Sequence, residues 1–438
     1  MSRTKLLLGL SVGLSAVVAM LAGIGLESSP ARDSRSAATP AELVVWDWSY
    51  FPSDDKKTLD VLDRMFMKAN PDVRIKHVGI PFNTAYAKFR TAIAARKGPD
   101  VVTLYPGTFA ADYRKGLVPL NDKIPNWMRQ QVPMLRSSAA PDGNIYALPL
   151  TAYGYVWAYN KALFRKAGLN PNKPPSTWPQ FLDACSKLRT AGVEPITAAW
   201  KDGYLLEWFL YVYGGQLLSK SEAKRWANGD LPVNNPKFAR ALDLALSLDA
   251  KNCFQDGAAS RVVYNDMNDD FSAQKTAMLL WYGGTSDFKK WETGLGRSNV
   301  GLFLPPRLPG SPYPRIMDTG PNNGLAITNW SKQQDAAWRY LAFRQTRAAQ
   351  AAQWKLSQAL PNNATVSLTS TSPITKQMLG FLRIKDNYTI YTGFPASIVS
   401  ILDQQAPRVV SGELSVKALL DQMEAAMARL RPKLKSGS

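Results

Sequence analysis

Aromatic side chains follow several expected strands at the point where each strand ends. The candidates are Trp48 and Tyr50 after the apolar run 43–46, Tyr105 after the run 99–104, and Trp281 and Tyr282 at the end of the run 277–281. A hydroxylated solute such as a sugar presents polar edges and C–H faces, so its site combines hydrogen-bonding groups with flat aromatic surfaces. These positions predict a binding surface for a small hydrophilic molecule, with core packing as the alternative for each ring.

A carboxylate lies within a second aromatic cluster. Trp200, Tyr204 and Trp208 recur every four residues, the spacing that places side chains on one face of a helix. Glu207 stands beside them and could accept two hydroxyl hydrogen bonds, which would orient a sugar through charge-assisted bonds. Helix packing for the rings and a solvated position for Glu207 are the alternatives.

The sequence contains few groupings of residues that are typical of enzyme active sites. Its single histidine, His77, lies within the expected strand 73–78 and has no paired nucleophile, so a serine or cysteine triad is not indicated. No cluster of cysteine and histidine offers a zinc site, and no phosphate-binding glycine loop is present. We expect no enzyme activity, no cofactor and no metal. A secreted glycosidase, which needs only two carboxylates facing one bond, is the enzymatic alternative.

Strand and helix patterns alternate along the chain, and these elements must position the candidate residues. Apolar runs at 43–46, 73–78 and 99–104 are separated by helical stripes, in which apolar residues recur three and four positions apart. Strands connected through helices are normally parallel, and such sheets bind ligands at the carboxyl ends of their strands. Further expected elements are a helix capped by Thr177, a helix at 236–248, strands at 277–281 and 301–304, and helices at 333–356 and 416–430.

The N-terminus has the order of charged and apolar residues found in export signals. Arg3 and Lys5 precede an uncharged run at 6–26, and neither cysteine of the chain is near enough to carry a lipid. We expect a signal peptide at 1–26 that is cleaved, with a retained anchor as the alternative, and then a polar spacer at 27–41. The protein is therefore expected to be exported, to the periplasm or the cell surface.

The chain is basic and long enough for two cores. It has 438 residues and a formal net charge of +19, of which the first 38 residues contribute +2. A basic surface attracts polyanions, but the Lys and Arg residues are mostly scattered among acidic ones, and export argues against nucleic acid as a partner. Cys185 and Cys253 could pair after export or remain buried thiols, and the sequence leaves this open.

Several short motifs together resemble a known family. They are GPDVV at 98–102, KGLVPL at 115–120, YALP at 146–149, YNKALFRKAGL at 159–169, PSTW at 175–178 and QKTAM at 274–278. In this order the chain resembles the extracellular, or periplasmic, solute-binding proteins of ABC importers, in the maltose-binding-protein-like family 1 whose members bind mono- and oligosaccharides. The resemblance covers most of the exported chain.

The resemblance implies an α/β fold with two lobes, the type II periplasmic-binding-protein fold, in which each lobe is a mixed sheet flanked by helices and hinge strands join the lobes. The implied parts are lobe 1 at 42–149, lobe 2 at 150–319, a return to lobe 1 at 320–358 and C-terminal helices of lobe 2 at 359–438. It also implies closure about the hinges, a monomer with a sugar as its small-molecule ligand, and permease subunits in the membrane as partners.

The implied crossings between the lobes add candidate binding residues. The first crossing falls at 149–153 and the next at 318–324. The candidates there are Tyr153, Asp318, Asn322 and Asn323. Asparagine side chains both donate and accept hydrogen bonds, which suits hydroxyl recognition, although turn formation is the alternative for this pair.

One departure from the family pattern leaves the ligand open. Many sugar-binding relatives carry a tryptophan just after the Gly-Gly pair that follows the Ala-Met motif, where this chain has Thr285 and Ser286. Trp281 or Tyr282 would then supply the stacking ring. Alternative ligands in the same fold are an anionic solute such as a phosphorylated polyol, motivated by the positive charge, and ferric ion held by a tyrosine cluster. A protein anchored in the envelope is a further alternative.

Overall fold

The alternating apolar runs and amphipathic segments of the first hundred residues form one sheet with helices beside it. The computed structural model describes residues 39–50, 54–282 and 286–436. The strands of the first sheet are β1 (Ala41–Asp47), β2 (Val73–Gly79), β3 (Val101–Leu104), β4 (Leu148–Pro149) and β10 (Gly324–Ile327), in the order β2-β1-β3-β10-β4. β1 is parallel to β2 and β3, as predicted, and β10 runs antiparallel to β3 and β4.

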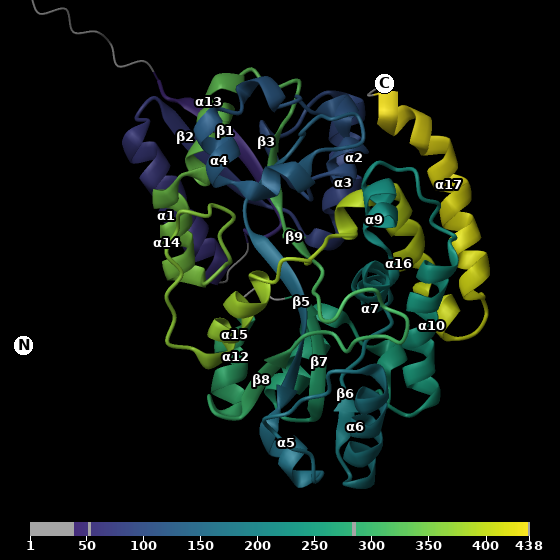
Figure 1. Ribbon diagram of the computed structural model, residues 1–438. Coiled ribbons are helices and arrows are strands. Elements are labelled where there is room, and N and C mark those ends of the chain that lie inside the picture. The colour runs from purple at the N-terminus through teal and green to yellow at the C-terminus, as the bar shows by residue number, and fades with distance from the viewer. Residues whose placement is uncertain (1–38, 51–53, 283–285, 437–438) are drawn as a thin grey trace, which may run out of the picture. The chain divides into compact units, whose positions relative to one another are not determined.

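Alternation within β1 explains how this sheet builds its core. Leu43 and Val45 are buried and pack in one cluster with Phe66, because successive side chains of a strand point to opposite faces. The helices of this sheet are α1 (Asp54–Ala69), α2 (Phe82–Ala95), α13 (Gln334–Gln345) and α14 (Arg347–Ser357). α1 and α14 lie side by side in Figure 1, although they are far apart in the sequence.

The second sheet surrounds a strand that is buried along its whole length. Its strands are β5 (Ala152–Asn160), β6 (Glu194–Ile196), β7 (Thr276–Tyr282) and β8 (Val300–Phe303), in the order β6-β7-β5-β8, and β9 (Thr319–Pro321) pairs with the start of β5. All nine residues of β5 are buried, as expected for a strand covered on both faces. The helices that pack near this sheet include α6 (Trp178–Thr190), α7 (Tyr204–Phe209), α10 (Pro236–Ala250), α12 (Ser286–Leu295) and α15 (Pro373–Leu382).

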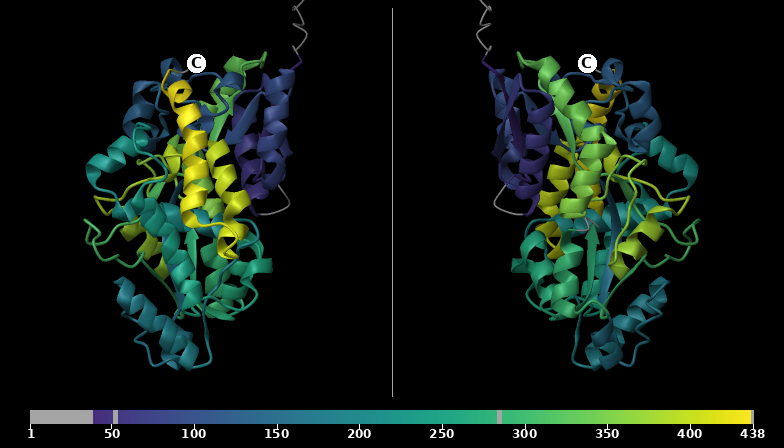
Figure 2. Two further views of the ribbon diagram at one scale, coloured as in Figure 1. Left: turned by 90° about the vertical axis from the view of Figure 1, so that its right-hand side faces the viewer. Right: turned by 90° about the vertical axis from the view of Figure 1, so that its left-hand side faces the viewer.

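Two C-terminal helices, α16 (Ala396–Val410) and α17 (Val416–Ser436), complete the described chain. α16 packs against α7 and α17, and α17 packs against α10. Figure 2 shows α17 running along α16 on one flank of the protein. Within the described residues, no helix combines the length and the apolar character needed to cross a bilayer.

The chain passes between the two sheets at neighbouring segments. Residues 150–151 join β4 to β5, and residues 322–323 join β9 to β10. Asn322 donates its backbone N–H to Thr151 O at 2.7 Å, and Leu150 donates to Asn323 O at 2.7 Å. A third passage follows α14, where Leu360 O accepts from the Ala152 N–H at 2.8 Å. These hydrogen-bonded segments are the candidate hinge, while the lobe boundaries given above stay predictions.

Local signals explain most of the element ends. Thr177 caps α6 as predicted, because its side chain accepts a hydrogen bond from the Gln180 N–H. The prediction of one helix over 333–356 is wrong: Thr346 is extended and its side chain caps α14, so the helix divides there.

Cys185 and Cys253 are buried free thiols, which answers the question the sequence left open.

Some predictions lie outside the described residues. They concern the signal peptide at 1–26, nearly all of the spacer at 27–41, and the Gly-Gly turn with Thr285.

Candidate functional site

Two adjoining cavities lie between elements of the two sheets. We call them the aromatic cavity, of about 310 Å³, and the polar cavity, of about 360 Å³. Five residues line both and form their common boundary. These are Phe82, Tyr105, Tyr264, Tyr282 and Asn322. Each volume falls at the small end of the range for ligand sites, about 300–1,000 Å³, so the two together suit a small solute.

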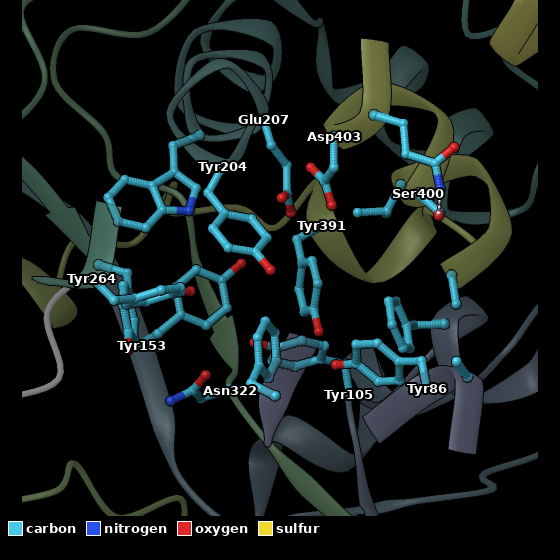
Figure 3. Close-up of a pocket in the computed structure, with 18 of the residues that line it drawn as sticks. Tyr86, Tyr105, Tyr153, Tyr204, Glu207, Tyr264, Asn322, Tyr391, Ser400 and Asp403 are labelled. Carbon is cyan, nitrogen blue, oxygen red and sulfur yellow. Dashed lines mark hydrogen bonds between the residues drawn. The ribbon is translucent and has the colours of Figure 1, made fainter. Parts of the chain in front are cut away.

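Rings from both sheets form the wall of the aromatic cavity. Those from elements of the first sheet are Phe82 and Tyr86 on α2 and Tyr105 after β3, and those from the rest of the chain include Tyr153, Tyr155, Tyr204, Trp208, Tyr264 and Tyr391. Figure 3 shows Tyr204, Tyr391 and Tyr105 around the same space. The rings contact one another, for example Tyr204 with Tyr264 at 5.4 Å between centroids. Such contacts keep the wall rigid and leave flat surfaces for a ligand.

Two carboxyl groups lie on one side of the aromatic cavity. Glu207 on α7 is 8% exposed, and both Glu207 and Asp403 on α16 line the space, where Figure 3 shows them side by side. Burial raises the pKa of Glu207 to about 7, although the neighbouring Tyr211 and Asp403 oppose the shift. Burial and the charge of Glu207 raise the pKa of Asp403 well above its ordinary value. The pair therefore holds a proton near neutral pH when the cavity is empty.

A close approach of backbones brings these two carboxyl groups together. Gly203 precedes α7 with a φ of 79°, a left-handed conformation that favours glycine. A Cβ atom on Gly203 would lie 2.5 Å from the Cα of Asp403. The absence of a side chain at Gly203 is therefore what lets the start of α7 pack against α16.

A buried arginine lines the polar cavity. Arg344 on α13 is 1% exposed, and its Nη1 donates to the hydroxyl of Tyr340 at 3.1 Å. Its Nε has no hydrogen-bond partner among the described residues. Asp47, Asn323 and Gln353 line the same cavity. A buried arginine in the wall of the cavity is a candidate partner for an anionic or hydroxyl group of a ligand.

His77 lies behind the polar cavity between two carboxylates. Its Nδ1 is 2.8 Å from Asp63 Oδ2, and its Nε2 is 3.5 Å from Asp47 Oδ2. Burial alone would lower the pKa of His77, but the hydrogen bonds and charges of Asp47 and Asp63 raise it to about 9. The charged imidazole fixes the carboxylate of Asp47, which lines the polar cavity.

The titration of His77 tests this arrangement. It is the single histidine of the chain, so NMR of untagged protein follows it without assignment, and we expect a midpoint of about 9. Because this pKa lies above the ordinary value of 6.5, protonated His77 stabilises the folded protein. This contribution to the free energy of unfolding is complete below pH 6.5 and is lost as the pH rises through about 9. The free energy of unfolding should fall by about 3 kcal/mol over this range. His77→Gln should remove the pH dependence of stability between pH 6.5 and about 9. A midpoint of about 6.5 for His77 in the wild-type protein would contradict a charged imidazole between Asp47 and Asp63.

Eight of the twelve residues predicted for the site line the two cavities. They are Trp48, Tyr105, Tyr153, Glu207, Trp208, Tyr282, Asn322 and Asn323. The other four, Tyr50, Trp200, Trp281 and Asp318, do not line them. Contact of these eight residues with a ligand stays a prediction.

Two of the four lie directly behind wall residues. Asp318 is buried and accepts a hydrogen bond from the Tyr153 hydroxyl at 2.5 Å, and burial raises its pKa to about 7. Trp281 is buried and donates from Nε1 to Asp287, which lines the polar cavity, at 2.7 Å. Asp318 and Trp281 each orient a wall residue without lining a cavity themselves. At the end of β7 it is therefore Tyr282, and not Trp281, that lines the cavities.

The other two are fixed by local packing. The ring of Tyr50 stacks on His77 at 4.4 Å. The expectation that Trp200 shares a helix face with Trp208 is wrong, because α7 begins at Tyr204, after the left-handed Gly203. Trp200 instead packs edge to face on Phe254 at 5.2 Å.

Several residues of the cavity walls were not predicted from the sequence. Tyr264 lies in a π-helical turn and Tyr391 in a 3-10 turn, where no periodic pattern marks the inward side. Asp403 follows the buried Val399 by four residues, so a carboxylate in an apolar helix stripe was the available signal. Arg344 follows Tyr340 by four residues on α13 in the same way.

The described residues offer little to a metal ion. No group of three or more His, Cys, Asp and Glu side chains among them could hold one. A tyrosine site for ferric ion needs phenolates, yet burial raises the pKa of both Tyr105 and Tyr264 well above the ordinary value.

Comparison with known proteins settles the family. The sequence profile of the bacterial extracellular solute-binding proteins matches residues 48–351, which is more than half of the chain. The chain belongs to this family. Family membership agrees with the resemblance found in the sequence and with a role in solute transport.

Curated relatives of this solute-binding protein match parts of it. The sn-glycerol-3-phosphate-binding periplasmic protein UgpB of Salmonella typhimurium is 28% identical over 221 residues, which are 47% of this chain and 50% of the relative. UgpB of Brucella abortus is 27% identical over 157 residues, 34% of each chain. The chain thus spans about half the length of the first of these relatives and a third of the second.

Solved structures share the fold of this solute-binding protein over most of its length. A chitin oligosaccharide binding protein matches with a TM-score of 0.77 at 19% identity, over 90% of this chain and 99% of the other. Maltose-bound MalE3 of T. maritima matches with a TM-score of 0.71 at 16% identity, over 89% and 100%. The prediction of a two-lobed α/β fold is confirmed.

Proposed function

We propose that this solute-binding protein is the substrate-binding component of an ABC importer, and that it captures a carbohydrate between its lobes. The observation that carries the proposal is the wall of the two cavities, where aromatic rings from both lobes alternate with polar groups. Trp48, Tyr105 and Trp208 offer faces for sugar C–H groups, while Glu207 and Asn323 offer hydrogen-bonding groups. A ligand that contacts both lobes would stabilise the closed form, which is the form a permease can recognise.

Export and release to permease subunits belong to the same proposal. The family is named for extracellular proteins, and the signal pattern at 1–26 supports transport across the membrane. Mass spectrometry of the mature protein tests the cleavage. A chain that begins near the end of this segment is expected, and an intact Met1 or Ser2 would contradict it.

A panel of solutes tests the proposed ligand class. Thermal unfolding of the purified protein is measured with mono- and oligosaccharides, including maltose and chitin oligosaccharides, and the sugar is checked for chemical change. A ligand at about a hundred times its Kd contributes about 2.7 kcal/mol, so we expect the Tm to rise by a few degrees. Turnover of the sugar, or silence of every neutral sugar beside a response to phosphates, would overturn the carbohydrate proposal.

The buried Arg344 favours an anionic solute as the second candidate. The relatives named above bind sn-glycerol-3-phosphate by their names, and Arg344 is a buried cation that lines the polar cavity. A phosphate ester could place its anion on this guanidinium and its hydroxyl groups against the shared boundary of the cavities. Glycerol 3-phosphate therefore belongs in the panel beside glycerol.

A substitution at Arg344 separates the two candidates. If a phosphate lies on Arg344, Arg344→Met should weaken glycerol 3-phosphate binding at least about tenfold, because a charge-assisted bond is lost. Arg339→Met is the control, since Arg339 is exposed on the same helix and pairs with Asp72 at the surface. Calorimetry measures both variants, and their unfolding temperatures show whether each is folded. Equal affinity of the two variants would remove the anionic candidate.

A further inference from the structure

The acid pair of the aromatic cavity has no cationic partner among the described residues. Glu207 and Asp403 form no ion pair with any Lys, Arg or His of the described chain, although many surface carboxylates do. The Oδ1 of Asp403 is buried without a hydrogen-bond partner among the described residues. Asp202, a third acid, adds to the negative potential around both groups. Buried carboxyl groups without a cationic partner take up a proton, and a positive group of a ligand would compete with that proton for the pair.

Aromatic rings surround the space in front of this pair. Tyr391 is 7% exposed, lines the cavity, and its hydroxyl has no partner among the described residues. In Figure 3, Tyr391 and Tyr204 lie next to the carboxyl groups of Glu207 and Asp403. Ring faces attract cations through their quadrupole, most strongly where water is excluded. Rings with carboxyl groups behind them form a cage suited to an ammonium group.

The charged groups near the cage are compatible with binding of an ammonium group. Arg90 also lines the aromatic cavity, but it is exposed and lies over the ring of Tyr113 at 5.3 Å, where solvent screens its charge. Burial raises the pKa of Glu207, so the empty pair keeps a proton. A neutral hydroxyl group could use such a protonated pair, but it would leave the remaining negative charge of the pair buried without compensation.

We propose that the aromatic cavity binds the ammonium group of a cationic solute, an amino sugar or a quaternary ammonium compound, between the acid pair and the ring of Tyr391. This rests on the proposed function, since it assigns one end of the ligand within the same cleft. Binding would compensate the negative charge of the pair and shift its protonation equilibrium towards the ionised form, with release of a proton to solvent. The hydroxylated remainder of the ligand would extend past Asn322 into the polar cavity.

Matched pairs of probes test the charge itself. Calorimetry compares choline with its uncharged carbon isostere, dimethylbutanol, and glucosamine with glucose. We expect at least one cation to bind at least about tenfold more tightly than its neutral counterpart, and the two pairs tell a quaternary ammonium group from an amino sugar. Equal affinity within both pairs, or no binding of either cation, overturns the cation site. Neutral sugars that still bind in that case would leave the proposed function intact.

Variants locate the effect in the acid pair. Glu207→Gln and Asp403→Asn keep the shape of the side chains, and each should weaken the better cation about tenfold more than it weakens the neutral counterpart. Glu413→Gln removes an exposed carboxylate just after α16 and is the control. The unfolding temperature of each variant without ligand shows that it is folded. Cation affinity unchanged in both acid variants would contradict the assignment.

The pH dependence of cation binding gives a second measurement. Groups that face the pair are Asp202, Tyr211 and Tyr204, with Arg90 at a distance in the same wall. Because the ammonium group favours the ionised pair, cation affinity should rise as the pH increases through about 7, with release of a proton. Choline carries the same charge throughout this range, so a flat choline profile would contradict the displaced proton and with it the proposal.

Discussion

Trp48→Ala should weaken binding of the ligand about a hundredfold, or about 3 kcal/mol, which is the size of effect that a central aromatic anchor produces. Trp48 lines the polar cavity, and its ring lies 5.3 Å from that of Tyr105 and 5.7 Å from that of Tyr86. The indole therefore offers a surface to the ligand and holds two further wall residues. Calorimetry with the best solute of the panel measures the change.

The control for this substitution is a tryptophan of similar exposure away from the cavities. Trp338 is half-buried on α13 and packs against the core of the first sheet. Trp338→Ala should lower the unfolding temperature and leave the Kd within about twofold. If Trp48→Ala binds as tightly as Trp338→Ala, the aromatic wall does not carry recognition.

Gly203→Ala is expected to destabilise the protein by about 2–5 kcal/mol. A left-handed residue with a side chain costs about 1–2 kcal/mol, and forcing a carbon into a filled space costs about 1–3 kcal/mol more. The new Cβ would lie 2.5 Å from both Cα and the carbonyl oxygen of Asp403, which are backbone atoms that cannot rotate away. α7 and α16 would have to separate, and the acid pair with them.

Gly143→Ala separates the steric effect from the conformational one. Gly143 has the same φ of 79°, but a Cβ there meets nothing within 4 Å. Denaturant unfolding should show a loss of about 1 kcal/mol for Gly143→Ala, which is the conformational cost alone. Losses of equal size in the two variants would contradict the close approach of α7 and α16.

The first sheet was predictable because its signals are local. Alternation at Leu43 and Val45 and the helical stripes between strands fix β1, β2 and β3 within short windows, and the connections make them parallel. Six of the eight predicted cavity residues follow a related rule, since the ends of strands and the crossings meet at one place in such folds. Glu207 and Trp208 were marked instead by the four-residue spacing of aromatic side chains.

The rest of the site depends on contacts between distant segments. Glu207 and Asp403 are almost two hundred residues apart, and only the packing of α7 on α16 brings them together. Tyr391 lies in a short turn whose inward side no periodicity marks. Arg344 would be exposed on most helices of this composition, but the hydroxyl of Tyr340 and the walls of the polar cavity enclose it.

Capture of a solute between the lobes is decided by a crystal structure of the protein with the best ligand of the panel. We expect electron density in the aromatic and polar cavities, in contact with Tyr105 from the first lobe and Trp208 from the second. Density on an outer surface, or a ligand that contacts a single lobe, would contradict capture between the lobes.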